Sequence, residues 1–339
     1  MARYRASRLV GIVMTAALAA AACGSATQTP NPSSTPPTQA PSLIAGPSAG
    51  PATSPSASPA PGASQTPAPT PVEGIPAFKH IYLIIMENKE YGSIVGSRAA
   101  PYENGLIARY GLATNVYAVA HPSEPNYIAL TSGGLQGVTG DGHYDLGAPS
   151  VFDQIEAAGH TWRVYAQDYP GGCSTASVAA GVVDGPGAAG QYARKHNPAI
   201  SYKSISRNPT RCANITHLAG FDPAAADFEM IVPNLINDMH SSSVAAGDAF
   251  LRVFVPEITD SPAFADSVLF ITWDEGGTSR GGGGHIATIV VSPGMTPASR
   301  YSGAATHYSL LRTIEDAWGM PYLAQAATTL PLVFPYQAS

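Results

Sequence analysis

The segment HIYLIIMEN, residues 80–88, places a nearly continuous apolar run directly before a glutamate and an asparagine. Such a run predicts a strand that is buried on both faces, as in the centre of a parallel sheet. Further strands are expected at residues 115–120, 161–167, 228–232, 267–273 and 286–292. Helices are expected at residues 101–110, 125–131, 151–158, 245–255 and 307–318. This alternation predicts an α/β fold with a mostly parallel central sheet and helices on both faces.

The N-terminal segment has the features of an export signal. Residues 1–23 place three arginines before a short apolar run that ends in small residues at Cys23. The run is short for a membrane span, and its end resembles a bacterial lipoprotein signal in which the cysteine is lipidated. An ordinary secreted protein that is cut nearby is the alternative. Residues 24–73 are mostly Pro, Ser, Thr, Ala, Gly and Gln, which predicts a disordered tether before one folded domain at residues 74–339.

Charge and cysteine content narrow the class of protein. The formal net charge is −6 and only 12% of the residues are charged, so a nucleic-acid partner is not expected. With Cys23 modified, Cys173 and Cys212 remain. An even remainder outside the cytoplasm predicts a disulfide between them, and two free buried thiols are the alternative.

Polar residues stand next to the ends of four predicted strands, where sites form in open α/β sheets. Carboxylates that converge there repel one another unless a cation lies among them. Oxygen and imidazole ligands together suit a divalent metal. The sequence therefore predicts a metal site, with scattered loop residues as the alternative. The residues concerned are Glu87, Asn88, Asp238, His240, Asp274, Glu275 and His285.

Ser123 stands at the start of a predicted helix, within the string HPSEPNY at residues 121–127. At this position backbone N–H groups can receive an anion. A free serine is a weak nucleophile, and metal binding is one way to activate it. The alternative is a serine that only caps the helix.

Together these motifs resemble the bacterial phosphoesterase family of acid phosphatases and phospholipases C, within the wider alkaline phosphatase superfamily. The resemblance implies an alkaline phosphatase-like fold and a catalytic domain at residues 74–339. It also implies hydrolysis of phosphoric esters through a phosphoserine intermediate. The strings that carry it cover most of residues 78–322 in the family's order: IIMENKEY, HPSEPNYIALTSG, YARKHNP, VPNLINDMH, FITWDEGG, GGGGHIATIVVSPG and THYSLLRTIEDAWGMP.

The resemblance implies a role for each matching residue. Ser123 matches the nucleophile, Asn126 matches an asparagine that contacts a phosphoryl oxygen, and Asn88 is a metal or phosphoryl ligand. His196 is expected to touch the phosphate or to protonate the leaving group. His307 is expected to cap a helix or to take part in catalysis. The implied metal ligands are Glu87, Asp238, His240, Asp274, Glu275 and His285.

Two departures from the family pattern bear on the metal. Asp274-Glu275 replaces the common Asp-His pair, and Asp238 and His240 are closer in sequence than usual. The additional carboxylate favours harder cations over two zinc ions. The expected cofactor is one or more divalent ions, with calcium, magnesium, manganese, iron and zinc as candidates.

The expected substrates are small phosphomonoesters, with release of phospholipid head groups by a phospholipase C reaction as the second candidate. Membrane attachment is expected only through the N-terminal lipid anchor. The G-x-S-x-G match at residues 277–281 lacks the strand and helix that a serine esterase needs around it. Tyr127 stands where the sulfatase motif requires arginine. An inactive binding protein tethered to the cell surface is the rival from another class.

Overall fold

A computed structural model describes residues 73–175 and 191–336 of this protein. The predicted signal at residues 1–23, with Cys23, lies outside the described residues. So does the predicted linker, except for its last residue. Within the described ranges, no helix combines the length and the apolar character needed to cross a membrane.

A nine-stranded sheet forms the centre of the described domain, in the order β4-β3-β5-β1-β6-β7-β2-β8, with β9 paired to β2. The predicted central strand is β1, and all six of its side chains are buried because the sheet is covered on both faces. It pairs in parallel with β5 and β6. The strands are β1 (Ile81–Met86), β2 (Gly111–Tyr117), β3 (Trp162–Ala166), β4 (Ile215–His217), β5 (Phe228–Val232), β6 (Val268–Trp273), β7 (His285–Val291), β8 (Ser299–Tyr301) and β9 (Ala305–Thr306).

The prediction of a mostly parallel sheet is confirmed, with β7 as an antiparallel strand inside it. β7 runs antiparallel to β6 on one side and to β2 on the other. His285 begins β7 and is paired with Tyr117, the last residue of β2. The start of β7 therefore lies at the edge where the neighbouring parallel strands end.

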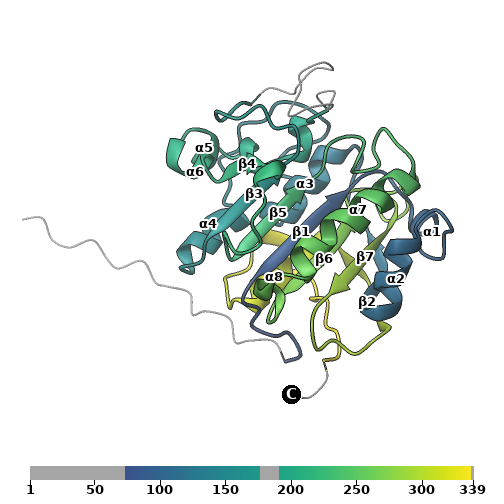
Figure 1. Ribbon diagram of the computed structural model, residues 1–339. Helices are drawn as coiled ribbons and strands as arrows, with labels where there is room; N and C mark the ends of the chain where they lie inside the picture. Colours follow the sequence, from purple (N-terminus) through teal and green to yellow (C-terminus); the bar gives the residue numbers. More distant parts are fainter. Residues whose placement is uncertain (1–72, 176–190, 337–339) are drawn as a thin grey trace, which may run out of the picture. The chain divides into compact units, whose positions relative to one another are not determined.

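Helices cover both faces of the sheet, as predicted (Figure 1). α2 contacts α7, and α3 contacts α8. The longer helices are α2 (Pro101–Arg109), α3 (Ser123–Ser132), α4 (Val151–Ala157), α7 (Val244–Thr259) and α8 (His307–Ala317). The short ones are α1 (Tyr91–Ile94), α5 (Lys203–Ser206) and α6 (Pro209–Cys212), with 3₁₀ turns η1 (Arg194–His196), η2 (Pro198–Ser201), η3 (Leu218–Gly220), η4 (Pro262–Phe264) and η5 (Ala324–Thr328).

Local sequence accounts for several of these boundaries. Ser150 and Asp153 form a capping box that starts α4. α3 ends at Gly133, which has a φ of 69°, and a side chain there would overlap the carbonyl group of Leu323. Glycine is therefore required both by the left-handed conformation and by the close packing.

The predicted strand at residues 115–120 is in fact β2, which begins earlier, at Gly111. A register shift between Ala113 and Val116 interrupts the alternation that would have marked its full length. β4, β8 and β9 were not predicted, because strands of two or three residues are too short to show a hydrophobic period.

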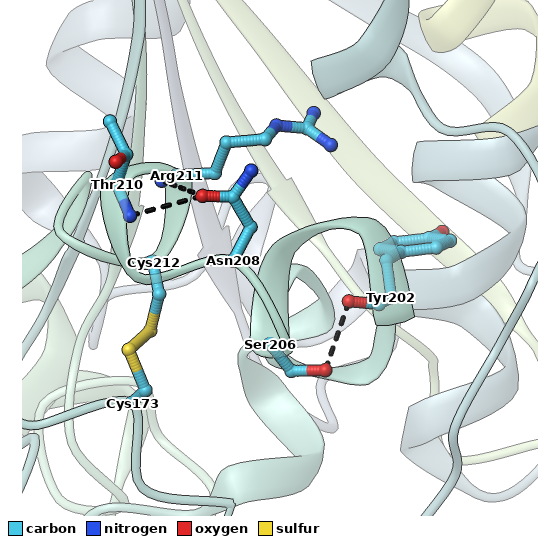
Figure 2. The surroundings of a disulfide bond; sticks show 7 residues. All are labelled: Cys173, Tyr202, Ser206, Asn208, Thr210, Arg211 and Cys212. Carbon is cyan, nitrogen blue, oxygen red and sulfur yellow. Dashed lines mark hydrogen bonds between the residues drawn. A yellow bond between two sulfur atoms is a disulfide. The ribbon is translucent and has the colours of Figure 1, made fainter.

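The predicted disulfide between Cys173 and Cys212 is present (Figure 2). It joins the segment after β3 to the end of α6. The side chain of Asn208 caps α6 by accepting hydrogen bonds from the backbone N–H groups of Thr210 and Arg211. The bond therefore fixes two segments that are 39 residues apart in sequence.

Candidate active site

Three segments bring predicted site residues together at the carboxyl edge of the sheet. Glu87 directly follows β1, Asp274 directly follows β6, and Ser123 is the first residue of α3. The Ser123 hydroxyl donates a hydrogen bond of 3.1 Å to Glu87 Oε2. The backbone N–H of Asn88 donates one of 3.0 Å to Asp274 Oδ1. These contacts place the serine between carboxylates from two central strands.

Ser123 is buried, with 1% of its surface exposed. It is the first helical residue of α3, and the N-cap position before it is held by Pro122 without a side-chain cap bond. The hydroxyl is therefore directed to Glu87 and not to the helix terminus. This geometry argues against the helix-cap alternative.

Glu87, His196 and His240 form a group that could hold a metal ion. Each offers one ligand atom, and these atoms all lie within 4.8 Å of one another. Glu87 and His196 are fully buried, whereas His240 is half-buried. The group thus combines one carboxylate and two imidazoles, and it has one member near solvent.

Two further carboxylates border this group. Asp238 Oδ2 lies 3.2 Å from His196 Nδ1, while Asp238 Oδ1 accepts a hydrogen bond from the His240 backbone N–H. Asp274 Oδ2 is buried and accepts no hydrogen bond from any described residue. A buried carboxylate oxygen without a donor is costly unless a cation or water binds it.

The pKa values of the site residues also indicate a cation at this position. Burial raises the pKa of Glu87 and Asp274, and it raises the pKa of Asp238 to about 7. Burial lowers the pKa of His196 to about 3, so its ring is neutral at neutral pH. A neutral imidazole can donate from only one nitrogen, yet its two nitrogens lie 3.1 Å from Glu87 and 3.2 Å from Asp238. A cation among these groups would resolve the conflict.

The nearby lysines Lys89 and Lys195 have other direct partners. Lys89 Nζ donates to the carbonyl oxygen of Met239 at 2.7 Å. Lys195 Nζ pairs with Asp141 at 2.7 Å. The residues present therefore fit a divalent metal. Two observations support this: Asp274 has an oxygen without a partner among the described residues, and the His196 imidazole lies between two carboxylates.

The structure places His196 beside two of the site carboxylates. It was expected to touch the phosphate or to protonate the leaving group. Its side chain is 1% exposed and lies between Glu87 and Asp238, and its Nε2 makes no hydrogen bond to a described residue. A neutral, enclosed imidazole of this kind suits metal binding better than proton donation.

The structure places Asn126, which was predicted to contact a phosphoryl oxygen, in the turn before Ser123. Its Oδ1 accepts hydrogen bonds from Val119 N at 3.0 Å and Ala120 N at 3.1 Å. Its Nδ2 donates to Ala120 O at 2.9 Å and Pro122 O at 3.3 Å. The amide is fully used in bracing the turn before Ser123. Asn88 uses Nδ2 for Glu87 Oε2 at 3.2 Å and keeps its second N–H, so it remains a candidate phosphoryl ligand.

Glu275 pairs with a histidine outside the metal-binding group. Its Oε2 lies 2.9 Å from His121 Nδ1, and His121 Nε2 lies 2.9 Å from the carbonyl oxygen of Thr278. The predicted extra metal ligand is instead paired with a histidine two residues before Ser123.

His285 is likewise separate from the metal-binding group. Its ring stacks between Tyr91 and Tyr117, with centroid distances of 4.3 Å and 4.9 Å. Its Nε2 lies 3.0 Å from the carbonyl oxygen of Thr114. The side chain therefore packs between β2 and α1, because the antiparallel strand β7 starts beside the end of β2.

His307 is buried at the start of α8, and its Nε2 lies 2.6 Å from the backbone carbonyl oxygen of Asp274. The cap of α8 is the side chain of Thr306, not His307. His307 thus supports the backbone of a site carboxylate, a role that neither predicted alternative describes.

Tyr127 is a site residue that the sequence prediction missed. Its hydroxyl donates a 2.5 Å hydrogen bond to Glu87 Oε1, and its ring stacks on His196 at 5.4 Å. Burial raises the pKa of Tyr127, which keeps the hydroxyl protonated as a donor. It lies four residues after Ser123, so both face the same side of α3. That spacing was a signal in the sequence.

Arg194 was also missed as a structural residue. Its guanidinium forms a buried ion pair of 2.8 Å with Glu124 and donates to the carbonyl oxygens of Gly142 and Tyr144. These bonds fix η1, which carries His196.

Comparison with known proteins identifies the family of this chain. Residues 97–321 match the model of the Phosphoesterase family. The chain belongs to the Phosphoesterase family. It is therefore a phosphoric-ester hydrolase, and the family predicted from the sequence is confirmed.

Two relatives are 30% identical to this chain over about three quarters of its length. It is 30% identical over 261 residues to a phosphatidylinositol-3-phosphatase of Mycobacterium tuberculosis, covering 76% of this chain and 83% of that protein. It is 30% identical to an acid phosphatase of Aspergillus fumigatus, covering 75% of this chain but only 58% of that protein. In fold it is similar to a phosphonate monoester hydrolase of Silicibacter pomeroyi, with a TM-score of 0.51, 13% identity and coverage of 75% and 76%.

Proposed function

We propose that this protein hydrolyses small phosphomonoesters, with Ser123 as the nucleophile and a divalent metal bound beside it. The observation that carries the proposal is the 3.1 Å hydrogen bond from the buried Ser123 hydroxyl to Glu87 within the candidate metal-binding group. Glu87, His196 and His240 would hold the ion, with Asp238 and Asp274 next to it. A bound divalent ion would favour the alkoxide form of serine and stabilise negative charge on the phosphoryl oxygens.

The side chains of the protein prepare the serine for attack. Glu87 Oε2 accepts a hydrogen bond from the Ser123 hydroxyl and is the group in place to take up its proton. The Tyr127 hydroxyl holds the other oxygen of Glu87 and so orients the carboxylate. Ser123 Oγ bonds to phosphorus, the ester P–O bond breaks, and the leaving oxygen takes up a proton from water. A second water then attacks phosphorus, the bond between Ser123 Oγ and phosphorus breaks, and phosphate is released.

Binding of the phosphoryl group cannot rest on the start of α3 alone. The backbone N–H of Glu124 is already bonded to Asp141 Oδ1 at 3.1 Å, and Pro125 has no N–H to offer. The first turn of α3 therefore provides fewer donors than an ordinary helix terminus. Asn88, which retains one side-chain N–H, is the protein group that we assign to a phosphoryl oxygen.

The donor set favours a hard or borderline cation. One carboxylate and two imidazoles would hold the proposed ion, with two more carboxylates next to it. The sequence predicted four carboxylates and two imidazoles, but Glu275 pairs with His121. Mixed oxygen and nitrogen donors suit Mn²⁺ or Fe²⁺, with Mg²⁺, Ca²⁺ and Zn²⁺ as the other ions to test. The ligands of the proposed ion would be Glu87, His196 and His240, with Asp238 and Asp274 next to it.

The named relatives favour monoesters over diesters. A phosphatidylinositol-3-phosphatase and an acid phosphatase both remove a terminal phosphate by name. We therefore place monoesters first, including phosphorylated inositol head groups. A substrate panel that contains both monoesters and diesters distinguishes this activity from phospholipase C-type cleavage of diesters.

We also propose an extracytoplasmic location, with export by residues 1–23 and a lipid anchor at Cys23. The disulfide between Cys173 and Cys212 supports an oxidising compartment. Labelling with a radioactive fatty acid, compared with a Cys23→Ala variant, tests the anchor. A wild-type protein that takes up no label would contradict it.

The central test is hydrolysis of p-nitrophenyl phosphate by wild type and Ser123→Ala, with chelator and with each divalent metal returned. The variant should lose at least about 1,000-fold in kcat while it keeps its fold and its bound metal. Bis-p-nitrophenyl phosphate in parallel separates monoesterase from diesterase. Near-normal turnover in Ser123→Ala, or a wild type that stays inactive with every metal, would overturn the proposal.

A further inference from the structure

Glu90 lies at the N-cap of α1, three residues after Glu87, but its carboxylate does not cap that helix. It accepts hydrogen bonds from across the active-site edge instead. Its Oε2 accepts from Gly277 N at 2.8 Å and Thr278 N at 3.2 Å. Its Oε1 accepts from Thr278 Oγ1 and His285 N, both at 3.1 Å. Both oxygens are thus engaged with the β6–β7 loop, residues 274–284, and the first residue of β7.

The glycines of this loop make room for the carboxylate. A Cβ atom at Gly276 would overlap Glu90 Oε2, and one at Gly284 would come within 3.0 Å of the same oxygen. Gly284 also has a φ of 93°, which disfavours a side chain. The glycine-rich loop and Glu90 are therefore complementary in shape as well as in hydrogen bonding.

The same loop supports the turn that leads to Ser123. Gly283 N donates to Ala118 O at 2.9 Å, and Ala118 N donates to Gly284 O at 3.0 Å. A Cβ atom at Gly283 would overlap the carbonyl oxygen of Ala120. A continuous set of contacts therefore runs from Glu90 through the loop to the backbone just before the proposed nucleophile.

We propose that Glu90 is a positioning residue for phosphoester hydrolysis, which holds the β6–β7 loop against residues 118–120 and so fixes Ser123. This inference rests on the proposed role of Ser123. A carboxylate suits the task because it only accepts hydrogen bonds, and its charge strengthens each bond from an N–H group. A glutamine at this position would turn an NH₂ group toward N–H donors and displace the loop.

The first experiment compares Glu90→Gln with wild type on p-nitrophenyl phosphate, at a temperature well below the melting temperature of both. A shift of the nucleophile by about 1 Å costs up to about 100-fold in rate. We therefore expect kcat to fall about 10- to 100-fold with KM nearly unchanged. Glu257→Gln, which changes an exposed carboxylate on α7, is the matched control and should leave kcat unchanged.

Two further variants keep the test valid if Glu90→Gln folds poorly. Gly276→Ala crowds the carboxylate from the loop side and should lower kcat in the same way with Glu90 present. Thr278→Val removes the side-chain donor alone and should give a smaller loss. Wild-type kcat in the folded variants would overturn the proposal and leave the proposed function intact, since Ser123→Ala tests that separately.

Amide hydrogen exchange provides a readout that does not need activity. In Glu90→Gln, the amides of Gly277, Thr278 and His285 and those of residues 118–120 should exchange faster, while β1 keeps its protection. Unchanged exchange at both segments would overturn the proposal even if the wild-type protein hydrolysed no ester.

Discussion

Two loops leave buried strands at the same edge of the sheet, and they use similar residues in opposite ways. The β5–α7 loop, residues 233–243, directs Asp238 and His240 toward His196 and Glu87. The β6–β7 loop directs only Asp274 toward Ser123. Its other predicted ligand, Glu275, is bound to His121. Both predicted ligands of the first loop are therefore directed toward the site, whereas only one of the two acids that begin the second loop is.

Local backbone structure explains the difference. In the β5–α7 loop, Asn234 Oδ1 accepts hydrogen bonds from Ile236 N and Asn237 N, and Met239 has a φ of 81°. This turn presents residues 238 and 240 to the site. The β6–β7 loop instead returns as a hairpin beside β2, where Glu275 pairs with His121, Thr278 with Glu90 and Arg280 with Tyr117. Position after a strand thus determines the edge of the sheet, while the neighbours determine whether a side chain is free to bind a ligand.

Two histidine variants, one in the β5–α7 loop and one at the start of β7, test this difference and have the largest expected effect on activity. His240→Ala removes a member of the proposed metal-binding group and should lower kcat/KM for p-nitrophenyl phosphate at least about 100-fold, with loss of bound metal. His285→Ala, the matched change at the start of β7, should keep its metal and most of its activity, because its partners are Tyr91, Tyr117 and Thr114. Equal losses of metal in the two variants would remove the distinction between the loops.

Variants of two adjacent acids test the same difference within the β6–β7 loop. Asp274→Asn alters the buried carboxylate beside Ser123 and should lower kcat about 100-fold. Glu275→Gln alters the partner of His121 and should lower kcat about tenfold or less. Steady-state kinetics at a fixed metal concentration measure both. A larger effect at Glu275 would return it to the metal site that the sequence predicted.

The pH dependence of stability gives a smaller effect. Burial raises the pKa of Asp238 from 3.8 to about 7, and the pKa of Glu87 and Asp274 is raised as well. Between pH 3.8 and about pH 7 the folded, metal-free protein holds protons that the unfolded chain has released. Its free energy of unfolding therefore falls as the pH rises through this range. A bound metal replaces those protons.

Added Mn²⁺ should therefore raise the melting temperature more at pH 8 than at pH 5. The measurement is the difference between the melting temperatures with and without metal at each pH. The buried acids Glu229 and Glu315, each with a pKa of about 8, contribute equally to both melting temperatures, so their contribution cancels in the difference. Asp238→Asn should reduce the metal effect at pH 8. A metal effect of the same size at both pH values would contradict the assignment of these carboxylates.

The sequence was sufficient to predict the central strands and the carboxylates that follow them. β1 and β6 are long and apolar, so Glu87 and Asp274 could be placed at one edge by strand topology alone. The roles of Asn126 and His285 could not be read in this way. Each depends on which backbone groups lie within hydrogen-bonding distance, and His285 bonds to Thr114, which is 171 residues away in sequence.

His196 shows a further reason why the sequence could predict only part of the site. It was identified as a site residue, but it follows no strand and lies in the short turn η1. Its direction is set by the buried pair of Arg194 and Glu124, 70 residues apart. No period or spacing in the sequence encodes such a pair, so the residue was found while its surroundings were not.

The central position of β1 also determines when the active site can form. The pairing of β6 with β7 is local, but Asn88 reaches Asp274 across 186 residues. Long-range pairings of this kind form slowly, because the entropy of closing a large loop is lost before any contact compensates for it. Glu87 and Ser123 therefore lack their carboxylate neighbour until the last third of the chain has been made and folded. A chain that crosses a membrane unfolded would acquire its catalytic centre only after transport is complete.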